Sequence, residues 1–347
     1  SASPKVRKLA REFGADIYQI QGSQREGRLS EEDVKSHIKD LISEIKTLCE
    51  NSNAIILAHY YQAPEIQDIA DFVGDSLDLS RKAHNTNAKT IVFCGVKFMA
   101  EVAKILSPNK KVILPDIDAG CSLEESCKTD KFENFKKNYP NHLVISYINC
   151  SAEIKALSDI IVTSSNALKI IQSLPKSQKI IFAPDKHLGN YLNKISGKNM
   201  ILWNGSCIVH ETFSEKELVR LKIRNPDAKV IAHPECPESI LAHSNFVGST
   251  SSLLKFVTTS PAEKFIIATE PHLIHQMKKV EPKKKFLIAP GNDGNCSCSN
   301  CPYMELNTIE KLIDCLESLS PEIKINRELI LKAKKPLNTM LKLSKLS

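Results

Sequence analysis

Aliphatic runs that end in polar residues occur at three evenly spaced places in this chain. They lie at residues 55–61, 143–149 and 230–235. Tyr147 stands 88 positions after His59, and His233 stands 86 positions after Tyr147 (147 − 59 = 88; 233 − 147 = 86). A fixed internal period is the signature of repeated structural units. The pattern therefore predicts three related domains.

Within each unit, short apolar runs alternate with segments of helical spacing. Proline or serine followed by glutamate predicts a helix start after each polar strand end. Strand-like runs recur in the same register at residues 90–93, 179–182 and 265–268, and again at 112–114, 200–202 and 286–288. Helix starts recur between these runs at residues 97–99, 187–189 and 272–274. Such alternation is typical of parallel sheets covered by helices on both faces. The predicted fold class is α/β, with three homologous three-layer αβα domains.

The repeat also predicts domain boundaries. We expect domains at residues 30–121, 122–207 and 208–305, with helices in residues 306–347 completing the first. A helix should begin after Ser30, because Ser30 and Asp33 form a capping-box pattern ahead of apolar residues at helical spacing. Residues 1–29 show no clear periodicity and are interpreted as an extended arm.

A small hydroxyl residue opens the second helix of each unit. These residues are Ser76, Ser164 and Thr250, again 88 and 86 positions apart. Free N–H groups at a helix N-terminus attract carboxylate or phosphate, and functional groups of parallel α/β domains collect beyond the carboxyl ends of the strands. Serine and threonine also cap helices with no ligand. The shared register favours a cavity for a ligand with several negative charges.

Cysteines follow the last strand of each unit. Cys121 and Cys207 occupy equivalent places, and the third unit offers Cys296, Cys298 and Cys301. Three thiolates on a four-iron cluster leave one iron open to act as a Lewis acid. A zinc site with His210 as fourth ligand, or a redox-active disulfide, fits the same spacing. Spacing alone leaves these alternatives open.

Composition narrows the class of protein. The 347 residues are 42% hydrophobic and 25% charged, as in soluble globular proteins. No apolar run approaches the ~18 residues of a membrane helix, and residues 1–30 do not resemble a signal peptide. We therefore expect a cytoplasmic protein, with a plastid as the alternative. Eleven cysteines in such a chain favour metal or redox chemistry. A net charge of +7 without a basic stripe argues against nucleic-acid binding.

Several ordered motifs resemble the quinolinate synthase family, also called quinolinate synthetase A. They include Ala58-His59-Tyr60-Tyr61, Gly74-Asp75-Ser76-Leu77, Cys207-Ile208-Val209-His210 and His233-Pro234-Glu235. The resemblance runs from about Ser30 to Ser347. It implies three domains in a pseudo-threefold arrangement around a central active site. It also implies a transferase (EC 2.5.1 class) of NAD biosynthesis, which condenses iminoaspartate with dihydroxyacetone phosphate to quinolinate, with a [4Fe–4S] cluster as cofactor. Functional coupling to an L-aspartate oxidase would fit.

The same resemblance implies individual roles. Cluster ligands would be Cys121, Cys207 and Cys301. Glu235 would act as general acid or base, Tyr61 would transfer a proton, and His59, His210 and His233 would contact the triose and share proton transfer. The substrate carboxylates would be oriented by Tyr147 and Asn149, and anionic groups held at Ser76, Ser164 and Thr250. Cys296 and Cys298 are spaced C-x-C rather than the family's C-x-x-C, which puts a disulfide there in doubt.

Two other classes of protein would share some of these features. An iron–sulfur or zinc sensor needs the three cysteines but not Glu235, Tyr61 and the histidines together. An aconitase-type hydro-lyase would use the same open iron with an arginine-rich pocket. Arginine is sparse in the repeat loops of this chain, whereas helix N-termini are plentiful. The condensing enzyme is therefore the preferred hypothesis.

Overall fold

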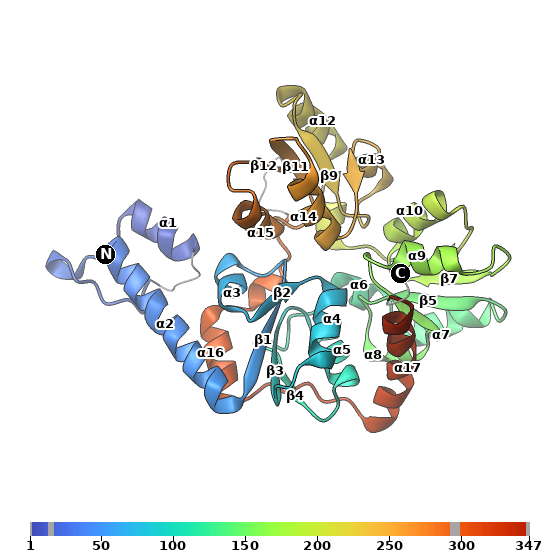
Figure 1. Ribbon diagram of the computed structural model, residues 1–347, viewed down its shortest axis with the longest axis horizontal. Helices are drawn as coiled ribbons and strands as arrows, with labels where there is room; N and C mark the ends of the chain where they lie inside the picture. The colour runs from blue at the N-terminus through green and yellow to red at the C-terminus, as the bar shows by residue number, and fades with distance from the viewer. Residues whose placement is uncertain (1, 13–16, 292–298, 345–347) are drawn as a thin grey trace.

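Three four-stranded parallel sheets form the framework of the chain (Figure 1). The computed structural model describes residues 2–12, 17–291 and 299–344. The strand orders are β2-β1-β3-β4, β6-β5-β7-β8 and β10-β9-β11-β12, so the three sheets share one topology. Every strand pair is parallel, and helices lie on both sides of the sheets. The predicted α/β class with three repeated domains is confirmed.

The elements follow the predicted order in each unit. The first unit contains β1 (Ala54–His59), α3 (Pro64–Ile69), β2 (Phe72–Gly74), α4 (Ser76–Asn85), β3 (Thr90–Cys94), α5 (Lys97–Leu106) and β4 (Lys111–Ile113). The second contains α6 (Ser122–Ser126), α7 (Thr129–Lys137), β5 (Leu143–Tyr147), α8 (Ala152–Ala156), β6 (Ile160–Val162), α9 (Ala167–Ser173), β7 (Ile180–Ala183), α10 (Lys186–Ser196) and β8 (Ile201–Leu202). The third contains α11 (Ile208–Glu211), α12 (Glu215–Arg224), β9 (Lys229–Ala232), α13 (Glu238–Leu241), β10 (Phe246–Val247), α14 (Thr250–Thr259), β11 (Lys264–Ala268), α15 (Leu273–Val280), β12 (Lys285–Ile288) and η3 (Met304–Leu306).

A hydrogen bond repeated in all three units ties the edge strand to the central strand. Side chains just before β2, β6 and β10 accept from the N–H of the central strand, each at 2.8 Å: Asp71 from Ile56, Asp159 from Val144 and Asn245 from Val230. Each pair spans 15 residues in sequence. Because the central strands are buried, these local bonds satisfy backbone donors that water cannot reach.

The second helix starts differently in the second unit. Ser76 and Thr250 begin α4 and α14, as predicted, whereas α9 begins only after its N-cap residue Asn166. Asn166 Oδ1 accepts from Thr163 N at 2.7 Å, which holds residues 163–166 in a turn. Ser164 therefore lies in that turn rather than at a helix N-terminus, and the prediction for this position is wrong.

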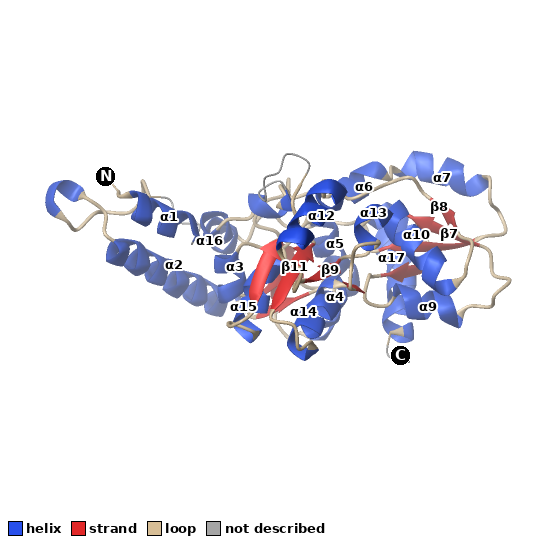
Figure 2. Ribbon diagram, turned by 90° about the horizontal axis from the view of Figure 1, so that it is seen from above, coloured by secondary structure: helices blue, strands red, loops and turns tan. Residues whose placement is uncertain are grey.

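The N-terminal segment is folded, contrary to the extended arm expected from the sequence. It contains α1 (Pro4–Glu12) and the short 3-10 helix η1 (Arg25–Gly27), and α1 packs against the start of α2 (Glu31–Ser52). Its buried residues form a separate core: Val6, Ala10, Ile20, Leu29, Val34 and Ile38. Figures 1 and 2 show this small unit projecting from the three sheets along α2. The Ser30–Asp33 capping box at the start of α2 is confirmed.

The C-terminal helices pack on two of the three units. α16 (Ile309–Ser318) lies against α2, beside the first sheet. α17 (Arg327–Leu343) lies mainly against α8 and β6 of the second unit and also contacts α5. The α17 helix is therefore shared between the first two units. That residues 306–347 complete the first domain stays a prediction. In the part of the chain that the structure describes, no helix has the length and apolarity to span a membrane.

A buried glutamate links α5 to α8. Glu101 is 9% exposed, and its carboxylate accepts from Ala152 N at 3.1 Å. Burial raises the pKa of Glu101 to about 7, although the charge of Lys155 opposes this. The folded chain therefore holds a proton on Glu101 between pH 4.5 and 7 that the unfolded chain releases. Its contribution to the free energy of unfolding falls as the pH rises across this range.

Glu101→Gln removes this titration. Relative to the wild type, we expect the variant to gain up to about 3 kcal/mol in free energy of unfolding between pH 4.5 and 7, since one pKa unit corresponds to 1.36 kcal/mol. Urea unfolding at several pH values measures the difference. Glu133→Gln, at an exposed position of α7, is the control and should show no such change. Parallel pH curves for Glu101→Gln and wild type would contradict the assignment.

Candidate active site

One cavity collects the residues predicted for the site. Its lining includes every one of them: His59, Tyr61, Ser76, Cys121, Tyr147, Asn149, Ser164, Cys207, His210, His233, Glu235, Thr250 and Cys301. They come from the carboxyl ends of strands in all three units. The space open to the centres of water molecules inside it is about 60 Å³. The repeat therefore brings equivalent loops of three units to one point.

The three thiols lie at the starts of helical turns. Cys121 is the N-cap of α6, Cys207 is the N-cap of α11, and Cys301 lies three residues before η3. Burial raises the pKa of all three, that of Cys301 to about 11, and Cys207 also feels the charges of the other two. Backbone N–H groups of each helical turn act in the opposite direction and favour the thiolate. The three thiols influence one another electrostatically, and a cation bound by them would favour the thiolate form.

The thiols are too far apart to share one small ion. Among the described residues, the group with three ligand atoms within 4.8 Å of one another is Cys207, His210 and Glu235, and it excludes Cys121 and Cys301. Sulfurs bound to one zinc ion, at about 2.3 Å from it, must lie within about 4 Å of one another. A single zinc on the three cysteines therefore does not fit this arrangement, whereas a larger metal group would.

His59 and His233 occupy equivalent positions and have the same tautomer. The N–H of Tyr61 donates to His59 Nδ1 at 3.1 Å, and the N–H of Glu235 donates to His233 Nδ1 at 3.4 Å. Because Nδ1 accepts in both, the proton of each neutral ring lies on Nε2. Burial lowers the pKa of His59 to about 4 and that of His233 to about 3. Both are neutral rings with one N–H donor available.

Glu235 lies at the centre of the polar groups. Tyr147 Oη donates to its Oε1 at 2.5 Å, and His210 Nδ1 lies 3.1 Å from its Oε2. Burial opposes ionisation, but His233, His210 and the Tyr147 hydroxyl together lower the pKa of Glu235 to about 2. His210 Nδ1 lies at ion-pair distance from this carboxylate, although among the described residues it forms no well-aligned hydrogen bond. Glu235 is a buried carboxylate that can accept a proton.

Two more buried polar atoms of the lining lack a partner among the described residues. They are Asn149 Oδ1 and Thr163 Oγ1. A buried polar group without a hydrogen bond costs about 1–3 kcal/mol, so its presence in a cavity points to a ligand or water. Polar atoms on more than one side of the cavity can therefore form hydrogen bonds with a bound ligand or water.

Comparison with known proteins identifies the family. A family model described as Quinolinate synthetase A protein matches residues 43–342. A protein named quinolinate synthase, from a Nostoc species, is 57% identical over 305 residues, covering 88% of this chain and 94% of that protein. This chain belongs to the quinolinate synthase family. Quinolinate synthases of Thermosynechococcus vestitus and Cyanophora paradoxa are 57% and 54% identical, over 88% and 94% of this chain and 96% and 98% of their own lengths.

A second family model matches outside the enzyme part. It is described as e3 binding domain and matches residues 1–35. This segment coincides with the separate N-terminal core and precedes residue 43, where the quinolinate synthase match begins. The chain therefore joins a small N-terminal unit to a quinolinate synthase body.

Thr269 is a contact residue of this quinolinate synthase cavity that sequence reasoning missed. It follows β11 and is fully buried. Its Oγ1 lies 2.6 Å from Tyr61 Oη and 3.0 Å from His210 Nε2. The hydroxyl thus joins the first unit to the third and completes a chain of polar contacts from Tyr61 through His210 to Glu235. Its only sequence signal was its place after a strand.

Asp185, which follows β7, was also missed. It caps α10 by accepting from Leu188 N at 2.7 Å, and its Oδ2 has no partner among the described residues. The side chain is fully buried. Burial, then the charge of Glu235, raises its pKa well above the usual range. Burial and the neighbouring Glu235 thus both disfavour the ionised form of Asp185.

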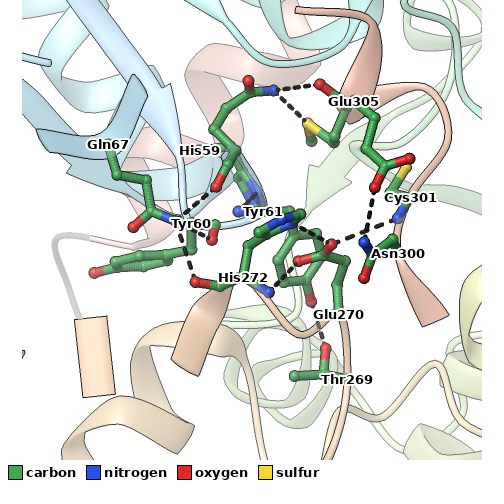
Figure 3. Close-up of polar contacts among 12 residues, drawn as sticks. His59, Tyr60, Tyr61, Gln67, Thr269, Glu270, His272, Asn300, Cys301 and Glu305 are labelled. Atoms are coloured by element: carbon green, nitrogen blue, oxygen red, sulfur yellow. Dashed lines mark hydrogen bonds and ion pairs between the residues drawn. The ribbon is translucent and has the colours of Figure 1, made fainter. Parts of the chain in front are cut away.

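Glu270 fixes the loop that carries Cys301 (Figure 3). Its Oε1 lies 2.7 Å from His272 Nδ1, its Oε2 accepts from His272 N at 2.8 Å, and Oε1 also accepts from Cys301 N at 3.5 Å. Burial raises the pKa of Glu270, whereas for His272 the hydrogen bond and charge of Glu270 outweigh burial and raise its pKa. Gln67 donates to His272 O at 3.1 Å, which connects this loop to the first unit.

The remaining described cysteines do not line the cavity. Cys94 and Cys315 are buried in the core beside the first sheet, and Cys49 packs against it, as expected for core residues. Cys127 and Cys150 lie together in the core of the second unit. Cys296 and Cys298 fall outside the described residues.

Proposed function

We propose that this chain is a quinolinate synthase that condenses iminoaspartate with dihydroxyacetone phosphate to give quinolinate, phosphate and two waters. The observation that carries the proposal is the convergence of three thiols, Glu235 and the histidine pair on one cavity in a member of this family. A reaction that joins two molecules and expels phosphate places the enzyme among the EC 2.5.1 transferases. Coupling to an L-aspartate oxidase and a cytoplasmic location belong to the same proposal.

Cys121, Cys207 and Cys301 would hold a [4Fe–4S] cluster. Their separation exceeds what one ion requires, and helical-turn N–H groups near each sulfur favour thiolates. When bound, such a cluster supplies a Lewis acid through the iron that no cysteine binds. His210 Nδ1 faces the same region, beside Cys207 and Glu235.

Glu235 would act as the proton acceptor and donor. The condensation and the two dehydrations each require a proton to leave carbon or nitrogen and another to reach a departing oxygen. Glu235 is ionised, and the Tyr147 hydroxyl holds its Oε1 in place. Tyr61 keeps its phenol proton because burial raises its pKa well above normal, so it can donate. Thr269 connects this hydroxyl to His210 for proton return.

The neutral histidines and helix starts would bind the anionic groups. The Nε2–H donors of His59 and His233 suit a phosphate or a carboxylate, since neutral imidazole donates without a competing proton transfer. Ser76 and Thr250 begin α4 and α14, where N–H groups and the helix dipole favour negative charge. Ser164 would contribute its hydroxyl from a turn. Tyr147 and Asn149 would orient the carboxylates of the aspartate-derived substrate.

Anaerobic purification tests the proposal most directly. Iron and sulfide content and the visible spectrum are measured first. Quinolinate formation is then assayed from dihydroxyacetone phosphate and freshly generated iminoaspartate. About four irons per chain with turnover support the proposal. A colourless zinc-bound protein that remains inactive after anaerobic cluster reconstitution would contradict it.

We also propose a second, separate function for residues 1–35, as a docking module for a protein partner of the E3 kind. The support is the match to the e3 binding domain together with the independent core of this segment. Arg25 begins η1 and Arg28 follows it; both are exposed, and among the described residues neither forms an ion pair. Two free cations on a projecting unit suit an acidic surface.

Reversing both charges should abolish docking. We expect Arg25→Glu/Arg28→Glu to lose binding to a purified E3 protein in size-exclusion chromatography, while quinolinate formation stays at the wild-type rate. Lys39→Glu/Lys46→Glu, on exposed positions of α2 beyond the matched segment, makes the same charge change and should retain binding. Absence of binding by the wild-type chain, or equal binding by both variants, would refute the docking function.

A further inference from the structure

A second hollow lies directly behind the active-site cavity. The space open to the centres of water molecules in it is about 310 Å³, and this hollow is more open to solvent than the inner cavity. It is lined by the first turns of α4, α9 and α14 and by Ser344 at the end of α17. Asp75 belongs to the lining of both spaces. The two spaces are therefore separated by little more than the starts of these helices.

Three cations line the outer hollow, one from each unit. They are Arg81, Lys169 and Lys255, and they repeat the register of the units (169 − 81 = 88; 255 − 169 = 86). Lys169 and Lys255 are exposed, and Arg81 is half-buried, donating to Ser344 O at 3.1 Å. Within residues 2–12, 17–291 and 299–344, none of the three forms an ion pair with a carboxylate. Their charges are available to a ligand.

The carboxylate of Asp75, which lies between the two spaces, accepts hydrogen bonds from other residues of the protein. Asp75 caps α4, and its Oδ2 accepts from Ser165 Oγ at 2.5 Å and from Ser251 Oγ at 2.9 Å. Ser165 and Ser251 are equivalent residues of the second and third units (251 − 165 = 86). Ser251 also donates to Asp78 at 3.2 Å. These hydrogen bonds hold the three helix starts together.

We propose that the outer hollow is an anion-collecting site, which binds the phosphate and carboxylate groups of the substrates before they enter the inner cavity. This inference rests on the proposed function. Both substrates are anionic, and the hollow adjoins the inner cavity at Asp75, which lines both spaces. The three cations outnumber the two carboxylates of the lining, Asp75 and Asp78, and Asp75 is hydrogen-bonded to Ser165 and Ser251. A recess with an excess of one sign of charge raises the local concentration of oppositely charged ligands and their association rate, in a manner that salt suppresses.

Removing two of the cations tests the site. For Lys169→Gln/Lys255→Gln we expect kcat/KM at low ionic strength to fall roughly tenfold and to depend less on salt than in the wild type. The loss falls on kcat/KM rather than kcat because neither lysine lines the inner cavity. Lys131→Gln/Lys216→Gln, at exposed positions elsewhere, removes the same charge and should behave as wild type. Unchanged kcat/KM and salt dependence in the first variant would overturn the proposal.

A binding measurement makes the test independent of turnover. Inorganic phosphate should raise the Tm of the wild-type chain above that in sodium chloride of equal ionic strength, because a ligand of the native state stabilises it. Lys169→Gln/Lys255→Gln should lose most of this rise, and the control variant should keep it. If wild type forms no quinolinate, the proposed function fails while the phosphate titration still decides the anion site. An equal rise in all three proteins would exclude this site.

Discussion

Glu235→Gln is expected to abolish most turnover while leaving the protein folded and its metal content unchanged. The amide can still accept the Tyr147 hydroxyl, so the shape of the cavity is retained. It cannot accept a proton, and general acid–base catalysis contributes about 10²–10⁴-fold to a rate. We expect kcat for quinolinate formation to fall by that factor. Steady-state kinetics on the anaerobic enzyme, with iron analysis of the same sample, measures both properties.

A second glutamate provides the matched control for this experiment. Glu211 lies on α11 at an exposed position and pairs with Lys186 and His187. Glu211→Gln makes the same chemical change close to the cavity without touching its lining, so kcat should remain at the wild-type value. If Glu235→Gln retains full activity, Glu235 has no part in proton transfer.

Alanine at any one of Cys121, Cys207 and Cys301 is expected to abolish binding of the iron–sulfur cluster. Each unit supplies one thiol to the lining, and among the described residues no further cysteine lines the cavity. Iron and sulfide should fall to background, the visible absorbance should vanish, and turnover should be lost with them. Iron analysis after anaerobic reconstitution, together with the absorption spectrum, is the measurement.

Cys127 provides the control that distinguishes loss of a cluster ligand from the general effect of removing a buried thiol. It lies only six positions after Cys121 in sequence, yet it is buried beside Phe132 and Cys150 and does not line the cavity. Cys127→Ala should keep a full complement of iron and most of the activity. Loss of iron in this variant would mean that the ligand assignment is wrong.

Much of the site was visible in the pattern of strands and polar residues. The positions of His59, Tyr147 and His233 follow from one rule, that parallel strands present their carboxyl ends at one edge. Hydrophobic periodicity is local, so equivalent positions could be recognised without knowing how the units pack. The sequence pattern did not predict the α1 helix, because this helix is short and buries its apolar residues against α2, which lies further along the chain.

Local hydrogen bonding changed one predicted element. Ser164 looked equivalent to Ser76 and Thr250, but Asn166 captures the N–H of Thr163 and delays the start of α9. An asparagine competes with a helix in this way whenever its side chain reaches a backbone donor two or three residues away. The repeat in sequence does not reveal which of two adjacent polar residues will cap the helix.

By itself, the sequence determined the three-unit α/β fold and the residues whose side chains reach the cavity, because strand and helix periodicity are properties of neighbouring residues. Only the tertiary structure decided which atoms of different units meet. Thr269 joins Tyr61 to His210, and Asp75 holds Ser165 and Ser251, through contacts that span 59 to 208 positions in the chain. A hydrogen bond requires its donor and acceptor to be placed to within a few tenths of an ångström. The relative placement of the units depends on the packing of many distant side chains at once, so local sequence patterns do not reveal these contacts.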